Sequence, residues 1–448
     1  MRRQTQAFAL GLVAIFSFEA VDLFFISRLG DAPLAAVSFT FPITWLIYGI
    51  GIGFEAGTAS VVSRAIGRRD LGMAARLTTD SVVLATLVLG LMGVIGLMTI
   101  TPVFGLLGAT PELMPLIHDY MVVWYWVAPL DACLWTCLAS LRARGRADLE
   151  AKIITAAALL NLVLDPIFIF GLFGFPRLEV MGAALATVVA NAIITVYTLW
   201  FLGVKMKMFA NPFAPIATIL QSWKHMLSIG LPAVFTNAII PLSAAIVVSM
   251  VAVYGVDAVA GFGVAARIEP FALLIFYSMS AVVSPFFGQN FGAGNFDRLL
   301  EARRLVARFC VAYGISLAIL LAFLAKPLTG MFSESDSIRE VATHYLWLMS
   351  LGYGAHGITM SMNAAFNGTG RPLPAVVVTS SRVIILFLPL ALLGRWLFGL
   401  EGIFAAGAVC NILLALLAWW WLGRHIEQAS REHDVGASPA VVASHARD

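Results

Sequence analysis

Charge is scarce in this sequence. Of its 448 residues only 12% are charged, comprising 28 Lys+Arg and 25 Asp+Glu, whereas 60% are hydrophobic, and the mean hydropathy is +0.91. A soluble domain carries about 25% charged residues and under half apolar ones. The composition therefore excludes a water-exposed globular protein and indicates an integral membrane protein. At roughly 20 apolar residues per spanning helix, the chain has room for about a dozen crossings and for no large soluble domain.

Phosphate-binding and metal-binding patterns are also lacking. None of the five lysines follows a glycine, so the sequence has no GxxxxGK[ST] loop for ATP, and it has no HExxH zinc motif. The four cysteines lie in apolar stretches, where a free thiol behaves as a small hydrophobe. We therefore predict a protein that is not an enzyme and has no cofactor. Its energy must come from an ion gradient or from a partner.

Twelve apolar runs predict the path through the membrane. They cover approximately residues 7–27, 34–63, 80–100, 118–140, 152–173, 181–203, 227–253, 258–289, 305–325, 341–366, 374–394 and 402–422. With the N-terminus taken as cytoplasmic, 21 Lys and Arg residues fall in inner segments and five in outer segments, while Arg267 and Arg382 fall inside spans. This bias places both termini in the cytoplasm.

The sequence repeats itself at an offset of 225 residues. The offset pairs Gly30 with Gly255 and Gly67 with Gly292, and near the end it becomes 220, pairing Asn191 with Asn411. Because six spans separate the copies, both copies have the same orientation in the membrane. The prediction is an all-α integral membrane protein with 12 transmembrane helices in two six-helix lobes related by a pseudo-two-fold axis along the membrane normal.

The repeat also defines the expected domains. Residues 1–204 form an N-terminal lobe, 205–224 a cytoplasmic linker, and 225–423 a C-terminal lobe. Residues 424–448 are polar and lack helical periodicity, so we predict a disordered cytoplasmic tail.

Carboxylates inside the spans are the first candidates for function. A charge in hydrocarbon costs several kcal/mol, so such residues usually face a cavity and take part in transport. Asp22 aligns with Val247 and Asp165 with Leu390 in the other repeat, so both acids exist only in the N-terminal half. Scaffold residues should recur in both copies, and these do not. The alternative is a structural polar cluster that locks the helix bundle.

Two further features surround these acids. Glu19 lies three residues before Asp22 on the same helical face, and two such carboxylates repel each other at low dielectric, which favours holding a proton. Asn161 lies one turn before Asp165, and Pro166 frees a backbone carbonyl. Carboxylate, amide and carbonyl oxygens suit Na⁺ as well as a proton. A structural role remains an alternative for Glu19.

Five other residues are weaker candidates, which we assign to the substrate cavity. Asp131 and His356 occupy equivalent positions of the repeats, which is compatible with substrate binding or with packing. Arg267 and Glu269 lie in the eighth span and Glu55 lies deep in the second. Arg267 and Glu269 have ion pairing, with each other or with other charges of the bundle, as their alternative role.

Several motifs together resemble the multidrug and toxic compound extrusion (MATE) family, and most of all its DinF-like branch. They are VDLFFISRLG at 21–30, AIG at 65–67, LRARG at 141–145, NLVLDP at 161–166 and NFGAG at 290–294. The resemblance implies an antiporter of two six-helix lobes in the bacterial inner membrane. It also implies a cation site formed by Asp22, Asn161, Asp165 and Thr187. Na⁺ bound there is the only metal expected.

The resulting functional prediction is a cation-coupled antiporter, driven by H⁺ or Na⁺, that exports organic cations, drugs or toxic metabolites by alternating access. Its expected partners are a small-molecule substrate and membrane lipid, with no nucleic acid, and the protein is expected to be monomeric. The alternative is a lipid-linked precursor flippase of the same superfamily. Such a flippase needs cationic residues to hold a pyrophosphate, and the spans hold only Arg267 and Arg382 against several acids.

Overall fold

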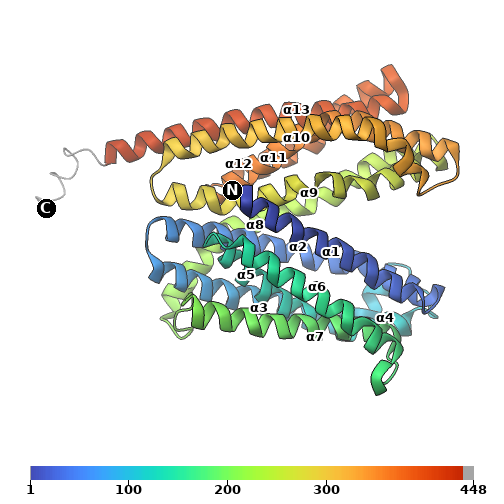
Figure 1. Ribbon diagram of the computed structural model, residues 1–448, viewed down its shortest axis with the longest axis horizontal. Coiled ribbons are helices and arrows are strands. Elements are labelled where there is room, and N and C mark those ends of the chain that lie inside the picture. The colour runs from blue at the N-terminus through green and yellow to red at the C-terminus, as the bar shows by residue number, and fades with distance from the viewer. Residues whose placement is uncertain (1, 437–448) are drawn as a thin grey trace, which may run out of the picture. The chain divides into compact units, whose positions relative to one another are not determined.

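The computed structural model describes residues 2–436, and within this range the secondary structure is helical, without strands (Figure 1). The side chains of residues 2, 3, 19, 20, 240, 384, 435 and 436 are outside the description. The elements are α1 (Arg2–Ser27), α2 (Asp31–Gly67), α3 (Leu71–Leu106), α4 (Met114–Trp124), α5 (Val127–Ala143), α6 (Ala147–Phe170), η1 (Leu172–Gly174), α7 (Glu179–Trp200), η2 (Phe201–Lys205), α8 (Ile216–Ala252), α9 (Val256–Gly292), α10 (Phe296–Gly330), α11 (Asp336–Thr369), α12 (Leu373–Ser381), η3 (Arg382–Phe387) and α13 (Leu388–Gly436).

The helices form two compact units, Met1–Val234 and Phe235–Asp448, whose boundary falls inside α8. This boundary lies beyond the predicted linker 205–224, of which the part from Ile216 onward already belongs to α8. The exact domain limits stay a prediction. Within each unit, short connections join long helices that run alongside one another (Figure 1).

Ten described segments are long and apolar enough to cross a membrane. One of them, Leu373–Asp434, contains two crossings, because the chain turns at Gly399, whose φ is 63°. The turn brings Gly402 against Gly394, so that a Cβ on Gly402 would lie 1.9 Å from the Gly394 carbonyl oxygen. With α11, the described residues provide the twelve spans that the sequence predicts.

α11 is long enough to span but less apolar than its neighbours. Its glycines pack against other helices: a Cβ at Gly352, Gly354 or Gly357 would come within 2.8 Å of α13, α10 or α9. Because protein rather than lipid surrounds α11, polar side chains such as Ser361 and Thr369 are buried there, and the Thr369 hydroxyl donates to the Phe366 carbonyl at 3.1 Å. Burial by other helices therefore explains its low hydropathy.

The helix boundaries in the structure follow the sequence repeat. α2 and α9 are both 37 residues long, and their ends are related by the offset of 225. Each begins after a glycine with positive φ, 119° at Gly30 and 104° at Gly255. The later offset of 220 has a simple cause, since the connection that contains η1 is longer than the turn at Gly399.

One local prediction is wrong. The tail from residue 424, predicted to be disordered, is helical as far as Gly436. His425 stacks on the rings of Phe291 and Phe366, and Ile426 is buried, so these two side chains pack against the second unit. Residues 437–448 lie outside the described part. The fourth predicted span is confirmed as one segment, Met114–Ala143, long and apolar enough to cross a membrane, although it is interrupted between α4 and α5 at Tyr125 and Trp126.

Candidate functional site

Three helices of the first unit bring the principal candidates together. Asp22 lies on α1, Asn161 and Asp165 lie on α6, and Thr187 lies on α7. α6 packs against both α1 and α7. Asn161 and Asp165 are one turn apart on the buried face of α6, with exposed fractions of 3% and 0%.

Asn161 connects Asp165 to Thr187. In the amide orientation that satisfies both neighbours, its nitrogen lies 2.8 and 2.7 Å from the two carboxylate oxygens of Asp165 and donates to them. The amide oxygen then accepts from the Thr187 hydroxyl at 3.0 Å. The Thr187 side chain also lies 3.2 Å from the Ala183 carbonyl of its own helix. This network fixes the rotamer of Asp165 in a buried place.

Asp22 belongs to the same cluster, because its carboxylate interacts electrostatically with Asp165. Tyr120 of α4, which is 8% exposed, interacts with both acids. The backbone of Glu19 lies in α1, but its side chain is outside the described part of the chain, so its role stays a prediction. We name Asp22, Asp165, Asn161, Thr187 and Tyr120 the acid cluster.

The acid cluster has the chemistry of a monovalent cation site. Two neighbouring carboxylates at low dielectric repel each other, and a proton or a cation relieves that repulsion. In the hydrogen-bonding orientation described above, the Asn161 amide presents its nitrogen to Asp165, which suits an ionised carboxylate as the acceptor. For Asn161 to serve as a Na⁺ ligand, its amide must turn to present oxygen instead.

Glu55 has a partner other than substrate. The Arg142 guanidinium forms an ion pair with Glu55 and a second with Glu150, whose Oε2 lies 2.9 Å from Arg142 Nε. Arg142 and Glu150 are 7% and 1% exposed, and the Arg142 guanidinium also lies 4.9 Å from the centre of the Phe8 ring. This network joins α1, α2, α5 and α6, so the arrangement favours a structural role for Glu55.

Asp131 is also hydrogen-bonded within the first unit. Its Oδ1 accepts from Asn191 Nδ2 at 2.7 Å, linking α5 to α7, and it is 5% exposed. The bond gives the buried carboxylate a fixed partner. It does not bring Asp131 into the acid cluster by any contact described above.

The second unit has a different polar cluster, centred on Glu269 of α9. Glu269 Oε2 accepts from the Tyr345 hydroxyl of α11 at 3.0 Å, and Tyr353, about two turns farther along α11, interacts electrostatically with the same carboxylate. Tyr345 and Tyr353 are 6% and 0% exposed. The carboxylate thus has a phenolic donor, Tyr345, as its hydrogen-bond partner rather than a second acid.

Arg382 adds positive charge to this cluster. It begins the π-helix η3, it is half-buried, and it interacts electrostatically with Glu269, His356 and Tyr277. Among the described residues, none of the ion pairs includes Arg382. Arg267 is exposed and is not paired with Glu269 in this part of the chain. We name Glu269, Tyr345, Tyr353, His356 and Arg382 the arginine cluster.

Two features of these sites are not predicted from the sequence, namely the two buried tyrosines and the pairing of Arg142 with two glutamates. Tyr120 and Tyr345 were not selected, although the offset of 225 relates them to each other. A tyrosine kept at equivalent positions of both repeats was the available signal. The pairing of Arg142 with two glutamates had no comparable signal, because it depends on contacts between three helices.

The chain is similar to several known proteins along most of its length. The MatE family model matches residues 7–167 and 232–393. A FAD transporter of Shewanella oneidensis is 36% identical over 418 residues, covering 93% of this chain and 92% of that protein. The multidrug export protein MepA of Staphylococcus aureus is 25% identical over 415 residues, covering 91% and 90%. The crystal structure of the Vibrio cholerae MATE transporter VcmN in the bent form has a TM-score of 0.90 at 28% identity and covers 97% of both chains.

Proposed function

We propose that this chain, which belongs to the MATE family of membrane transporters, couples export of its substrate to H⁺ or Na⁺ at the acid cluster. The observation that carries the proposal is the placement of Asp22 beside Asp165, with Asn161 bridging Asp165 and Thr187. Export from the cytoplasm across a bacterial inner membrane, with both termini cytoplasmic, is part of the same proposal.

The coupling follows from the charge of the two acids. When both are ionised, their repulsion disfavours close approach of α1 and α6 at this level, and a bound cation removes that penalty. The beginning of α1 is held independently: Gln4 Nε2 donates to the Gly145 carbonyl at 2.7 Å, and a Cβ at Gly11 would lie 3.3 Å from Ala151 Cα. Cation binding therefore acts on the half of α1 that carries Asp22. The cation biases one transport state and substrate the competing one.

The test uses purified protein in liposomes under separately imposed pH and Na⁺ gradients. We expect Asp22→Asn and Asp165→Asn to reduce gradient-driven transport to the level of protein-free vesicles. Asp31→Asn is the matched control, because Asp31 is an exposed residue in the first turn of α2. Transport that persists in both cluster variants contradicts the proposal.

For the substrate, we propose a flavin dinucleotide or a similar anionic aromatic molecule alongside the organic cations expected for the family. Two observations favour it: the relative from Shewanella oneidensis is a FAD transporter, and Arg382 is a half-buried cation without an ion pair among the described residues. A guanidinium matches the geometry of diphosphate oxygens, and the nearby Tyr277 ring, which is 38% exposed, offers an aromatic face.

Binding measurements separate these substrate classes. FAD, riboflavin and ethidium are titrated against wild-type protein and against Arg382→Gln and Arg382→Lys. Loss of a charge-assisted hydrogen bond weakens FAD binding by roughly 10-fold or more in Arg382→Gln. Riboflavin, which lacks the diphosphate, and ethidium should bind as before. The exposed Arg395→Gln serves as control. Equal loss for all three ligands contradicts a phosphate contact at Arg382.

The lipid-linked precursor flippase stays the alternative function. It shares the requirement for an intramembrane cation that Arg382 supplies. Movement of a pyrophosphate-linked lipid between leaflets by the reconstituted protein, without export of FAD or of cationic dyes, would favour it.

A further inference from the structure

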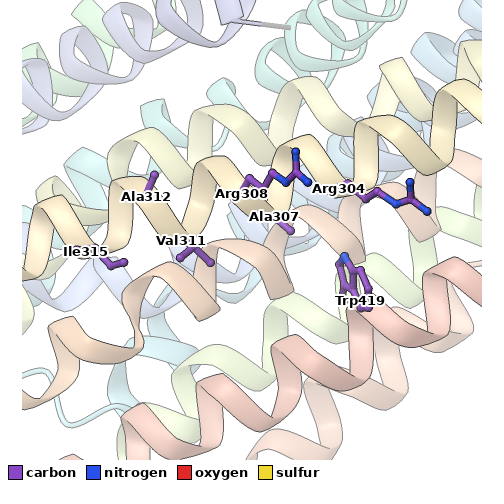
Figure 2. Close-up of a pocket in the computed structure, with 7 residues that line it drawn as sticks. All are labelled: Arg304, Ala307, Arg308, Val311, Ala312, Ile315 and Trp419. Carbon is purple, nitrogen blue, oxygen red and sulfur yellow. The ribbon is translucent and has the colours of Figure 1, made fainter.

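A groove on the second unit combines basic and apolar side chains. It has a volume of about 620 Å³ and lies between α10 and α13. Six of its lining residues follow one face of α10 at helical spacing, and the seventh comes from α13: Arg304, Ala307, Arg308, Val311, Ala312, Ile315 and Trp419. Figure 2 shows both arginines toward one end of the groove, Val311 and Ile315 toward the other, and Trp419 on the opposite wall.

The change from basic to apolar residues falls where α10 enters hydrocarbon. Residues 309–325 contain no charged side chain, and at 1.5 Å per residue they extend about 26 Å, close to the thickness of a bilayer core. Arg308 is the last charged residue before this stretch. The two arginines therefore lie at the level of lipid headgroups, and Val311, Ala312 and Ile315 lie at the level of acyl chains.

The wall formed by Trp419 is held in place by a buried arginine. Arg303, which is 7% exposed, donates from Nη1 to the Trp419 carbonyl oxygen at 2.9 Å, and its guanidinium lies 4.2 Å from the centre of the Trp419 ring. Gly423 leaves the space for this guanidinium, since a Cβ there would lie 1.5 Å from Arg303 Nη1. Arg303 also interacts with Glu427. Contacts with Arg303 thus fix the position of Trp419 on one wall of the groove.

The two groove arginines are not neutralised by the protein. Both are exposed, and no ion pair in the described part of the chain includes Arg304 or Arg308. The equivalent helix of the first unit differs, because the offset of 225 places Thr79 and Val83 at these positions, and the nearby Arg76 is paired with Asp80. The positive end of the groove is therefore a property of the second repeat alone.

We propose that this groove binds an anionic phospholipid. Its phosphate contacts Arg304 and Arg308, the interfacial ring of Trp419 lies beside the headgroup region, and one acyl chain lies along Val311, Ala312 and Ile315. Charge complementarity and the order of basic and apolar residues along α10 identify the occupant as a lipid rather than a free anion. This site is independent of the acid cluster and of the proposed substrate.

The experiment measures lipid binding directly, without transport. Purified protein in detergent is titrated with phosphatidylglycerol and phosphatidylcholine of the same chain length, and bound lipids are counted by native mass spectrometry. The wild type should retain phosphatidylglycerol more tightly. In Arg304→Gln/Arg308→Gln that preference should fall roughly 30-fold, since each basic residue near an anionic lipid contributes a factor of about five.

The matched control removes two exposed arginines elsewhere on the same unit. Arg298→Gln/Arg431→Gln changes the net charge equally and lies outside the groove. It should keep the wild-type preference, and Ala312→Trp, which fills the apolar end, should weaken retention of both lipids. Equal binding of the two lipids by the wild type, an equal loss in the control, or displacement of the lipid by inorganic phosphate alone would overturn the proposal.

Discussion

Tyr120 and Tyr345 occupy equivalent positions of the two repeats, but the charges beside them differ. Tyr120 lies near Asp22 and Asp165, whereas Tyr345 donates a hydrogen bond to Glu269 in a cluster that also holds Arg382. The first cluster is acidic, and the second contains one acid and one permanent cation. Duplication has kept the aromatic residue and the helix arrangement while the charged residues have diverged.

Under the proposed function, this difference gives the two repeats separate tasks. An acidic cluster attracts a cation, and an arginine that forms no ion pair among the described residues attracts an anion. Asp131 and His356 are a second pair of equivalent positions that differ in the same sense, a carboxylate in one repeat and an imidazole in the other. Under the function proposed above, a transporter that moves an inorganic cation and an organic anion would use both environments, and each copy of the fold provides one of them.

The largest expected effect tests which acid couples transport. Asp165→Asn should abolish gradient-driven transport, while Glu269→Gln should retain coupling, because Glu269 has a hydroxyl donor and a nearby arginine rather than a second acid. Uptake into proteoliposomes under a pH gradient measures both. If Glu269→Gln uncouples transport as completely as Asp165→Asn, the division between the repeats is wrong.

The next effect concerns stability of the first unit. Arg142→Gln leaves Glu55 and Glu150 without their shared cation, and removal of one partner of such a buried network should lower the free energy of unfolding by about 3–5 kcal/mol. Arg146→Gln is the matched control, because its pair with Asp148 is nearly half-exposed on both sides and contributes less than about 1 kcal/mol. Thermal unfolding in detergent compares them. Equal shifts would show that the buried network adds nothing beyond a surface pair.

A smaller effect should be the same in both repeats. Gly30 and Gly255 have positive φ and no neighbouring atom within 4 Å of an added Cβ, so alanine at either position meets backbone strain without a clash. Each substitution should lower the free energy of unfolding by about 1–3 kcal/mol. Denaturation of Gly30→Ala and Gly255→Ala measures the two turns, and clearly unequal values would contradict their equivalence.

The smallest effect separates the two tyrosines. Tyr345→Phe removes the hydrogen bond to Glu269 and should cost about 1 kcal/mol of stability. Tyr120→Phe should cost less, because its hydroxyl has no hydrogen bond within the described residues, although its burial is similar. The same unfolding assay applies, and a larger loss for Tyr120→Phe would reverse the comparison.

The sequence predicts the fold class well because lipid imposes long apolar helices and because the repeat supplies an independent check. The ends of α2 and α9 follow the offset that Gly30 and Gly255 reveal. The boundary of the helical tail was missed because His425 and His433 counted as polar residues, yet both pack on aromatic rings. A histidine in the sequence is therefore a poor marker of where the last helix of a membrane protein ends.

The site was predictable only in part. Asp22, Asn161, Asp165 and Thr187 come together in the structure, and a carboxylate in an apolar run was sufficient to find Asp22 and Asp165. The partners of Glu55 were not predictable, because Arg142 and Glu150 lie on other helices and only packing brings them together. Spacing along one helix carries no information about such contacts.

The two repeats differ at the break between α4 and α5, because the equivalent helix α11 of the second unit is continuous. Pro129 has no N–H to bond the Tyr125 carbonyl, and Tyr125 instead packs where a Cβ on Gly93 or Gly96 would touch it. Tyr120 and Asp131 therefore lie on either side of an interruption in the helical hydrogen bonds. In the second unit, the single helix α11 carries both Tyr345 and His356 without such an interruption. The two pairs of equivalent residues are thus connected through different backbones, an interrupted hydrogen-bond ladder in the first unit and a continuous one in the second.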